Sequence, residues 1–347
     1  MHSKDNATAR RRLRKRIINT LRKPDDAANK VSQRMRPGIR WFAMIIQSLL
    51  DLYKSCTLCP RACQVDRTKG ELGYCRLPAD IVMDCALAHH GEEPPLSGTR
   101  GAGTIFLSSC NLGCIYCQNY QISHSAQGRN LTVLELAKVM LDLQKKDCHN
   151  VEPVTPTPQA PLVMEALCMA RMQGLTVPFV YNCGGYENPE VIKLFDGMVD
   201  IYLPDFKYGL EKDAVDFSAA PEYPRFALDS LREMVKQVGD GLELKNGVAQ
   251  RGIIIRHLVL PDRIENSKEA LKLIKKKIST SVQLSLMSQY TPIAKVRNHP
   301  ILGRRITKSE CEQVTDYALK LGFDNIFIQE VNDYELTPDF DRDNPFD

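Results

Sequence analysis

Three cysteines in the middle of the chain have a spacing suited to binding iron. Cys110, Cys114 and Cys117, called the triad below, form a C-x3-C-x2-C motif, and the apolar run 104–107 before them is typical of a short buried strand. Thiolates are the ligands that iron–sulfur clusters need. Because a four-iron cluster has one more iron than the triad has thiolates, one iron would stay free to bind a small molecule. We therefore expect chemistry at this cluster rather than electron storage; three thiols that bind zinc or no metal are the alternative.

A second group of cysteines lies nearer the N-terminus. Cys56, Cys59, Cys63 and Cys75, called the knuckle below, follow a C-x2-C-x3-C-x11-C spacing. Four thiolates so close in sequence suit a closed metal site, which would hold either zinc or a second iron–sulfur cluster. The spacing does not choose between these metals, and four unligated thiols are the alternative.

The segments around the triad must form the scaffold that positions these cysteines. Strands are expected at 104–107, 151–155, 177–182, 199–203, 252–260 and 282–287, with helices between them and a last strand at 325–329. Capping boxes at Thr132 and Thr307, Asn188 before a proline, and Asn266 mark helix starts. Six β–α repeats predict an α/β fold with a parallel sheet covered by helices. The periodicity fits a doubly wound sheet as well as a barrel.

Polar residues gather where the expected strands end. In parallel α/β folds, sites lie at the carboxyl ends of the strands. The residues found at those ends are Cys110, Thr155, Asn182, Asp205, Lys207 and, within its strand, Arg256. Asp205 and Lys207 are two apart, so both can point to the same face. The alternative is an ordinary salt bridge at the rim of the sheet.

Taken together, these motifs resemble the radical S-adenosylmethionine superfamily, and within it the group similar to pyruvate formate-lyase activating enzyme. The resemblance covers most of residues 56–330. It rests on Cys56-Thr57-Leu58-Cys59-Pro60-Arg61, Gly91-Glu92-Glu93-Pro94, the triad with Cys117-Gln118-Asn119-Tyr120, Asp205-Phe206-Lys207 and Arg256-His257-Leu258-Val259-Leu260-Pro261. It implies a partial (β/α)6 TIM-like barrel with the knuckle as an N-terminal extension.

The resemblance also implies a reaction and a set of site residues. A [4Fe-4S] cluster on the triad would bind S-adenosylmethionine and cleave it reductively to a 5′-deoxyadenosyl radical, which abstracts hydrogen from a substrate. Lys207 would contact the carboxylate of S-adenosylmethionine, Arg256 would line the adenosine pocket, and Tyr116 would lie beside the adenine. The remaining residues expected to bind this cosubstrate are Asn119, Thr155, Asn182 and Asp205.

Two features depart from the activating enzymes. Those enzymes usually carry a Gly-Gly-Glu-like run after the second strand, where it holds the methionine amino group, but this chain has Val154-Thr155-Pro156-Thr157-Pro158 there. Threonine hydroxyls and backbone carbonyls would have to replace that contact. The knuckle is also absent from the simplest activating enzymes. The substrate can therefore differ from the backbone glycine that those enzymes oxidise.

Composition sets the class and compartment that we expect. At 347 residues and 43% hydrophobic residues, the chain can bury a large core. Its 12 cysteines occur mostly in short metal-type runs, and with no secretory leader expected they favour a reducing, cytoplasmic setting. Residues 1–40 hold 13 Lys or Arg against three Asp, so the rest of the chain carries net negative charge. No apolar run is long enough to span a bilayer.

We expect four parts along the chain. These are a mobile basic tail (1–38), a helix at 39–53 with the cysteine-rich extension (39–100), the core barrel (101–330) and an acidic C-terminal tail (331–347). The helix at 39–53 is expected to pack on the core. The basic tail has alternative interpretations, because such a segment can bind an acidic surface or nucleic acid, or direct the chain to an organelle.

Three classes of function are compatible with these residues. The first is an activating-enzyme-like radical oxidoreductase that acts on a protein partner, with flavodoxin or ferredoxin as electron donor. The second is a radical enzyme acting on RNA or a small molecule; a basic tail alone is a weak signal for nucleic acid, so we do not expect that partner, nor a membrane. The third is a non-catalytic iron–sulfur or zinc protein, in which a fourth protein ligand would complete the triad's site.

Overall fold

The computed structural model describes residues 37–331, 337–342 and 344–346. The basic tail predicted for residues 1–38 lies almost wholly outside this part of the chain. Helix α3 (Pro37–Asp51) confirms that a helix forms at 39–53. The chain divides into a unit that ends at Leu50 and a unit that begins at Asp51, and the second unit carries the sheet. None of the helices described is long and apolar enough to cross a membrane.

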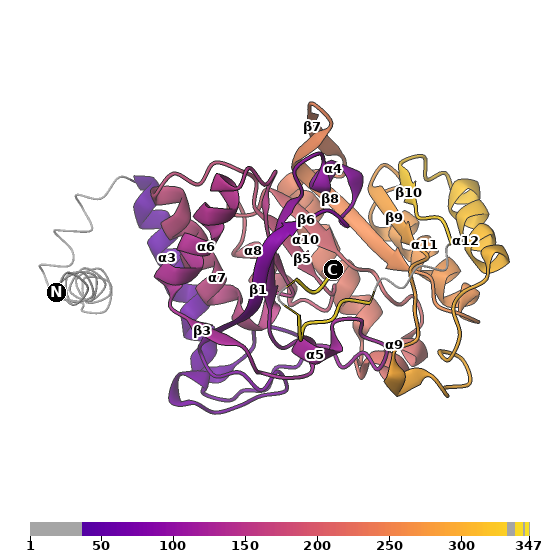
Figure 1. Cartoon of the computed structure of the whole chain (residues 1–347), viewed down its shortest axis with the longest axis horizontal. Helices are drawn as coiled ribbons and strands as arrows, with labels where there is room; N and C mark the ends of the chain where they lie inside the picture. Colours follow the sequence, from indigo (N-terminus) through magenta and orange to yellow (C-terminus); the bar gives the residue numbers. More distant parts are fainter. Residues whose placement is uncertain (1–36, 332–336, 343, 347) are drawn as a thin grey trace, which may run out of the picture. The chain divides into compact units, whose positions relative to one another are not determined.

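A mostly parallel sheet is the centre of the second unit (Figure 1). In the described residues its strand order is β10-β9-β8-β6-β5-β4-β2-β1-β3, with β7 paired to β8. The strands are β1 (Ile81–His89), β2 (Ala102–Leu107), β3 (Arg129–Leu131), β4 (Val151–Val154), β5 (Val180–Cys183), β6 (Ile201–Pro204), β7 (Leu242–Lys245), β8 (Val248–Leu258), β9 (Gln283–Met287) and β10 (Ile326–Ile328). The run from β2 to β10 is parallel, whereas β1, β3 and β7 pair antiparallel. The sheet is open, with β3 and β10 at its two ends, so the expected α/β partial barrel is confirmed.

The helices follow the expected repeat. Each connection between successive parallel strands contains one main helix. In chain order these are α6 (Val133–Lys145), α7 (Ala160–Met172), α8 (Pro189–Lys193), α10 (Tyr223–Val238), α11 (Ile264–Lys277) and α12 (Lys308–Leu321). Short helices α4 (Pro94–Ser97), α5 (Tyr120–Ser123) and α9 (Glu211–Ser218), and 3-10 turns at Leu52–Ser55, Arg67–Lys69, Thr157–Gln159 and Ala294–Val296, lie in the connections. Helix α6 contacts α7, α8 contacts α10, and α11 contacts α10 and α12, so the helices form a layer on the sheet.

Three of the four helix starts predicted from capping residues are confirmed. Thr132 and Thr307 each form the predicted capping box, and the Asn188 side chain caps α8. The helix start predicted at Asn266 is wrong, because α11 begins at Ile264 and Asn266 lies inside it. Its side-chain oxygen instead accepts hydrogen bonds from the amides of Gly209 (2.9 Å) and Leu210 (3.1 Å), and the Gly209 amide would otherwise be buried without a partner.

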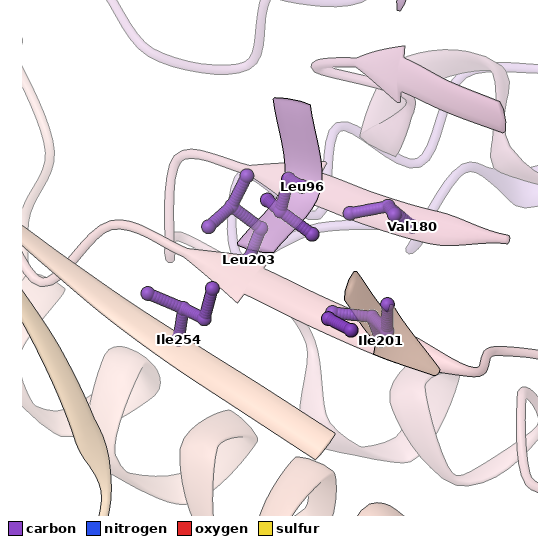
Figure 2. Close-up of a cluster of buried hydrophobic side chains, with 6 residues drawn as sticks. Leu96, Val180, Ile201, Leu203 and Ile254 are labelled. Atoms are coloured by element: carbon purple, nitrogen blue, oxygen red, sulfur yellow. The ribbon is translucent and has the colours of Figure 1, made fainter. Parts of the chain in front are cut away.

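An apolar cluster lies on the sheet face that carries the site residues (Figure 2). Its fully buried members come from α4, β5, β6 and β8, and include Leu96, Val180, Ile201, Leu203 and Ile254. Alternate residues of a strand share a face. Two positions beyond Val180, Leu203 and Ile254 stand Asn182, Asp205 and Arg256. The cluster is therefore an apolar floor beneath the polar groups at the strand ends.

The C-terminal residues pack near the β1–β2 end of the same sheet. The Phe340 ring meets the Phe106 ring edge-on, with centroids 5.3 Å apart, and the Phe346 ring lies 4.1 Å from that of His89. The Phe340 amide also donates to Gln121 Oε1 (3.0 Å). The acidic C-terminal tail thus contributes apolar contacts to the sheet unit.

Candidate functional site

The triad lies on the loop that follows β2. Ser109, at the start of this loop, has a left-handed backbone (φ 74°), which turns the chain sharply after the strand. Each sulfur has a hydrogen-bonding neighbour: the Leu112 amide for Cys110 (3.3 Å), the Ser218 hydroxyl for Cys114 (2.9 Å) and the Ser123 hydroxyl for Cys117 (3.2 Å). Donors aimed at sulfur stabilise bound thiolates.

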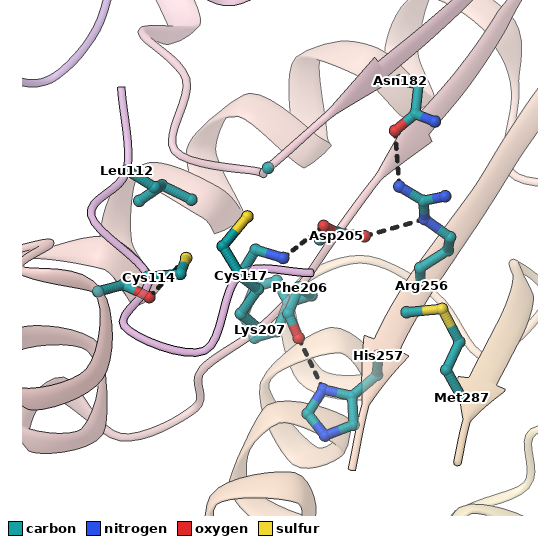
Figure 3. A network of polar contacts seen from close by, with 12 residues as sticks. Leu112, Cys114, Cys117, Asn182, Asp205, Phe206, Lys207, Arg256, His257 and Met287 are labelled. Carbon is teal, nitrogen blue, oxygen red and sulfur yellow. Dashed lines mark hydrogen bonds and ion pairs between the residues drawn. The ribbon is translucent and has the colours of Figure 1, made fainter. Parts of the chain in front are cut away.

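The three thiols are close enough to influence one another and Lys207. Figure 3 shows Cys114 and Cys117 beside Lys207. Burial raises the pKa of each thiol, that of Cys117 to about 11, and the neighbouring Cys114 adds to the increase for Cys110 and Cys117. The Lys207 ammonium acts in the opposite direction on all three. A nearby cation favours the thiolate, which is the form that binds iron.

The triad supplies the kind of donor that an iron–sulfur cluster needs. In residues 37–331, 337–342 and 344–346, no three His, Cys, Asp or Glu side chains gather around one point in a way that could hold a metal ion. A mononuclear zinc site would need its sulfurs about 3.8 Å apart, given a Zn–S distance of about 2.3 Å. In a cubane each thiolate binds a different iron, so its ligands stand farther apart. The triad offers three thiols from one loop, each with a hydrogen-bonding neighbour.

A chain of ion pairs crosses the strand ends beside the triad (Figure 3). Asp205 accepts from Lys207 Nζ (2.6 Å) and from Arg256 Nε (2.9 Å), and the Arg256 guanidinium also donates to Asn182 Oδ1 (2.6 Å). A β-bridge between Asp205 and Arg256 fixes their register. These side chains are only 13–17% exposed for Asp205, Lys207 and Arg256. Such a dry network holds its members in one geometry.

The network favours charge on all three of its ionised members. Burial alone would raise the pKa of Asp205, but Arg256 and Lys207 hold it below its usual value. Burial likewise opposes the charged form of Lys207, yet the Asp205 carboxylate raises its pKa above the usual range. Lys207 therefore keeps its positive charge next to the triad, which suits an anionic group on a ligand.

Tyr116 connects to the triad through hydroxyl groups. Its hydroxyl meets that of Tyr208 (2.7 Å), and the Tyr208 hydroxyl meets that of Ser218 (2.6 Å), which also contacts Cys114. The Tyr116 ring is buried and meets the Tyr290 ring edge-on. In this structure its side chain supports the triad loop, which is compatible with the prediction that it meets adenine.

The two remaining predicted residues lie at the same strand ends. Asn119 immediately precedes α5, and its backbone lies against the Cys117 sulfur. Thr155 follows β4 in a left-handed conformation (φ 54°), and its amide donates to the Asn182 carbonyl (2.8 Å). A β-branched residue with positive φ is strained, and such strain collects at functional sites. All predicted cosubstrate residues thus stand near the triad or the ion-pair chain, and their binding role remains a prediction.

Sequence reasoning missed three glutamates that face Arg256. Glu92 Oε2 accepts from Arg256 (3.4 Å), and Glu152 accepts from the Asn182 amide (2.7 Å). Burial raises the pKa of Glu93 and of Glu152, and each leaves one buried carboxyl oxygen without a hydrogen-bond partner in the described residues. Gly91-Glu92-Glu93-Pro94 was a motif of the resemblance, so it was the signal that could have revealed two of them. Glu152 gave none, because it sits in an apolar strand.

The loop after β4, where the sequence departs from the activating enzymes, is tied to the loop after β5. The Thr157 hydroxyl donates to Glu187 Oε1 (2.7 Å) and the Tyr181 hydroxyl lies 3.3 Å from Glu187 Oε2. Glu187 is 1% exposed. Burial raises its pKa to about 7, although hydrogen bonds from Thr157, Tyr181 and Cys183 favour the charged form. This carboxyl is therefore a buried group that titrates near neutral pH.

Replacing Glu187 by Gln should change how stability depends on pH. A carboxyl whose pKa rises from 4.5 to about 7 on folding makes the folded state less stable as the pH increases between those values. Relative to Glu187→Gln, the wild type should lose roughly 3 kcal/mol of unfolding free energy over that interval. Urea unfolding at a series of pH values measures this difference. The exposed Glu190→Gln is the control and should track the wild type; parallel curves for Glu187→Gln would contradict the assignment.

The knuckle lies beside the triad loop. Its four cysteines line one cavity together with Arg61, Arg67, Tyr74, Asn111 and Pro158. Arg61 Nε donates to the Asn111 carbonyl (2.9 Å), and the Ser109 hydroxyl donates to the Cys75 carbonyl. The structure therefore brings together the two cysteine groups that the sequence separates by 34 residues, counted from Cys75 to Ser109.

Comparisons with known proteins give a distant relative and a set of weak structural likenesses. No family model matches the chain. An uncharacterised protein of Methanocaldococcus jannaschii is 29% identical over 288 residues, which are 80% of this chain and 78% of that protein.

Similar solved structures include a radical SAM methyltransferase from Sphaerobacter thermophilus, with TM-score 0.47, 12% identity, and coverage of 65% of this chain and 66% of that one. For Streptococcus suis SuiB bound to the precursor peptide SuiA, the TM-score is 0.42 and the identity 10%, and the match covers 64% of this chain and 47% of that one. For the FeFe-hydrogenase maturase HydG from Carboxydothermus hydrogenoformans, the TM-score is 0.46 and the identity 10%, and the match covers 92% of this chain and 69% of that one. The chain spans just under two thirds of the methyltransferase and about half of SuiB. At these identities and TM-scores, the likenesses assign no chemistry to this chain.

Proposed function

We propose that the chain is a radical S-adenosylmethionine enzyme. The observation that carries this proposal is the meeting of three thiols from one loop with the Asp205–Lys207–Arg256 chain at the strand ends of an open α/β sheet. The thiols of Cys110, Cys114 and Cys117 would hold a [4Fe-4S] cluster. When bound, such a cluster supplies the electron that cleaves S-adenosylmethionine to a 5′-deoxyadenosyl radical.

The chain's own residues would bind and orient the cosubstrate. Lys207 has an ammonium fixed by Asp205 (2.6 Å) and offers positive charge to a carboxylate. Arg256 and Asn182 are hydrogen-bonded to each other (2.6 Å) and present polar edges above the apolar floor. That floor excludes water from below, which protects a reactive species and strengthens the fixed charges. The protein's part is position, charge and exclusion of solvent.

We propose further that the substrate is a protein partner and that flavodoxin or ferredoxin supplies electrons. The support is the resemblance of the triad, the D-x-K pair and the Arg256 segment to pyruvate formate-lyase activating enzymes. The loop after β4 differs from those enzymes. They carry a Gly-Gly-Glu-like run there, whereas in this chain the Thr157 hydroxyl donates to Glu187 Oε1 (2.7 Å). An enzyme that abstracts hydrogen from a protein, at a position other than the backbone glycine those enzymes oxidise, is compatible with both the resemblance and the different loop.

Anaerobic turnover tests the proposed function. The full chain is reconstituted with iron and sulfide, then mixed with dithionite and S-adenosylmethionine, and release of 5′-deoxyadenosine is measured by chromatography. We expect release that depends on iron, sulfide and reductant together. A fully reconstituted chain that gives no release and no change in its electron paramagnetic resonance signal on adding S-adenosylmethionine would leave a non-catalytic iron–sulfur protein as the better description.

A further inference from the structure

The four thiols of the knuckle face a common pocket. The four cysteines line one pocket that is partly open to solvent. Two hydrogen bonds between Cys56 and residues 64 and 65 close this loop, and the Ala62 amide donates to the Cys59 carbonyl (3.0 Å). Cys56, Cys59 and Cys63 thus lie on one closed loop, and Cys75 lines the same pocket from outside that loop.

The backbone of the knuckle approaches a sulfur as it would approach a bound thiolate. The Tyr74 amide donates to the Cys63 sulfur at 3.3 Å. A Cβ placed at Gly73 would lie 2.9 Å from the Cys63 Cβ and Sγ atoms, so only glycine lets the chain pass this close. Amide donors to sulfur are among the contacts that tune iron–sulfur clusters.

Two arginines at this cavity lack an anionic partner. Arg67 is 1% exposed and donates to the neutral carbonyls of Leu77 (2.9 Å), Pro158 (2.7 Å) and Pro78 (2.8 Å). It also stacks on Tyr53, 4.4 Å from the ring centroid. Within the described residues, no carboxylate forms an ion pair with Arg67. A buried charge without a counter-charge is costly, so this site calls for an anion.

The sulfurs are the groups placed to supply that anion. Cys56 Sγ lies 4.0 Å from an Arg67 guanidinium nitrogen. Arg61 stacks 3.7 Å above the Tyr74 ring, and its buried Nη2 has no hydrogen-bond partner in the described part of the chain. Four thiolates carry more negative charge than the iron core that they bind, so the ligated cluster is an anion. The two guanidiniums would balance it.

We propose that the knuckle binds a second [4Fe-4S] cluster through Cys56, Cys59, Cys63 and Cys75, with Arg67 and Arg61 as its counter-charges. A zinc site would use the same four thiolates, and the metal analysis below distinguishes the two metals. The two contacts from Arg61 and Ser109 place this cluster next to the triad loop. This site is distinct from the triad and does not depend on the proposed function.

Metal content in two complementary variants tests this assignment. One full-length variant replaces the triad with alanine (Cys110→Ala, Cys114→Ala, Cys117→Ala), and the other carries Cys59→Ala and Cys75→Ala. After anaerobic reconstitution with iron and sulfide, each variant should hold about half the iron and sulfide of the wild type. The triad-free variant should keep the Mössbauer signature of a cubane. Zinc in its place, or equal iron in wild type and Cys59→Ala/Cys75→Ala, would overturn the proposal.

The counter-charge is tested separately, in the triad-free background. Replacing Arg67 with Met removes a positive charge beside the cluster, which should shift its reduction potential to a more negative value. Electron paramagnetic resonance during a redox titration measures the shift. Lys69→Met, an exposed position of the same loop, is the matched control and should leave the potential unchanged. An unchanged potential in Arg67→Met would contradict the proposed charge balance, and Arg61→Met repeats the measurement if Arg67→Met does not fold.

Discussion

Replacing Cys114 with alanine is expected to abolish release of 5′-deoxyadenosine, down to the level seen without protein. Cys114 is 7% exposed, and its sulfur accepts from the Ser218 hydroxyl at 2.9 Å, so it is held on the side of the loop facing α9. Removing it leaves two thiolates, too few to anchor a cubane and keep one iron free. Iron content and product release are measured on the same anaerobic sample.

The control must separate loss of a ligand from loss of a buried thiol. Cys311 on α12 is 6% exposed, a burial close to that of Cys114, and lies outside both cysteine groups. Cys311→Ala should therefore keep both iron and product release. Release retained in Cys114→Ala would remove the basis of the proposed function. Equal loss in both variants would point to a folding defect, which circular dichroism then identifies.

The arrangement of the site residues could be predicted because β–α alternation determines where strands end. Asn182 and Asp205 end or follow predicted parallel strands, and Arg256 lies within the next predicted strand, although the three are far apart in sequence. Parallel pairing brings those ends to one edge, and the Asp205–Arg256 bridge and the 2.6 Å Arg256–Asn182 contact are its result. Helix starts at Thr132, Asn188 and Thr307 were equally local, since each cap uses atoms within three residues.

What could not be predicted depends on contacts between distant segments. Asn266 has a side chain that could cap a helix, but its oxygen instead accepts hydrogen bonds from the amides of Gly209 and Leu210, which come from a distant segment. Glu152 follows a valine and precedes a proline in a short strand, and only the folded sheet shows it facing Asn182. The antiparallel strand β1 was missed because its run Ile81–His89 alternates weakly and follows the knuckle. The packing of Phe340 on Phe106 likewise has no local signal.

Replacing Lys207 with Met should weaken both folding and the use of S-adenosylmethionine. The side chain keeps its length and loses its charge, so Asp205 retains only Arg256 as a partner (2.9 Å). Removing one member of a buried ion pair costs about 3 kcal/mol. If Lys207 also binds the cosubstrate carboxylate, the apparent KM for S-adenosylmethionine should rise by roughly 10- to 100-fold, the value of a charge-assisted hydrogen bond. Urea unfolding and initial rates of 5′-deoxyadenosine release measure the two effects.

Lys212→Met is the matched control for this prediction. Lys212 also pairs with an aspartate, Asp216 (2.5 Å), but its side chain is 82% exposed on α9. Water screens such a pair, so the substitution should change stability by less than about 0.5 kcal/mol and leave the KM unaltered. The comparison also distinguishes the two possible roles of Lys207, a structural salt bridge and binding of the cosubstrate. A stability loss with an unchanged KM would make the Asp205–Lys207 pair a structural salt bridge, whereas a raised KM in folded protein assigns Lys207 to the cosubstrate.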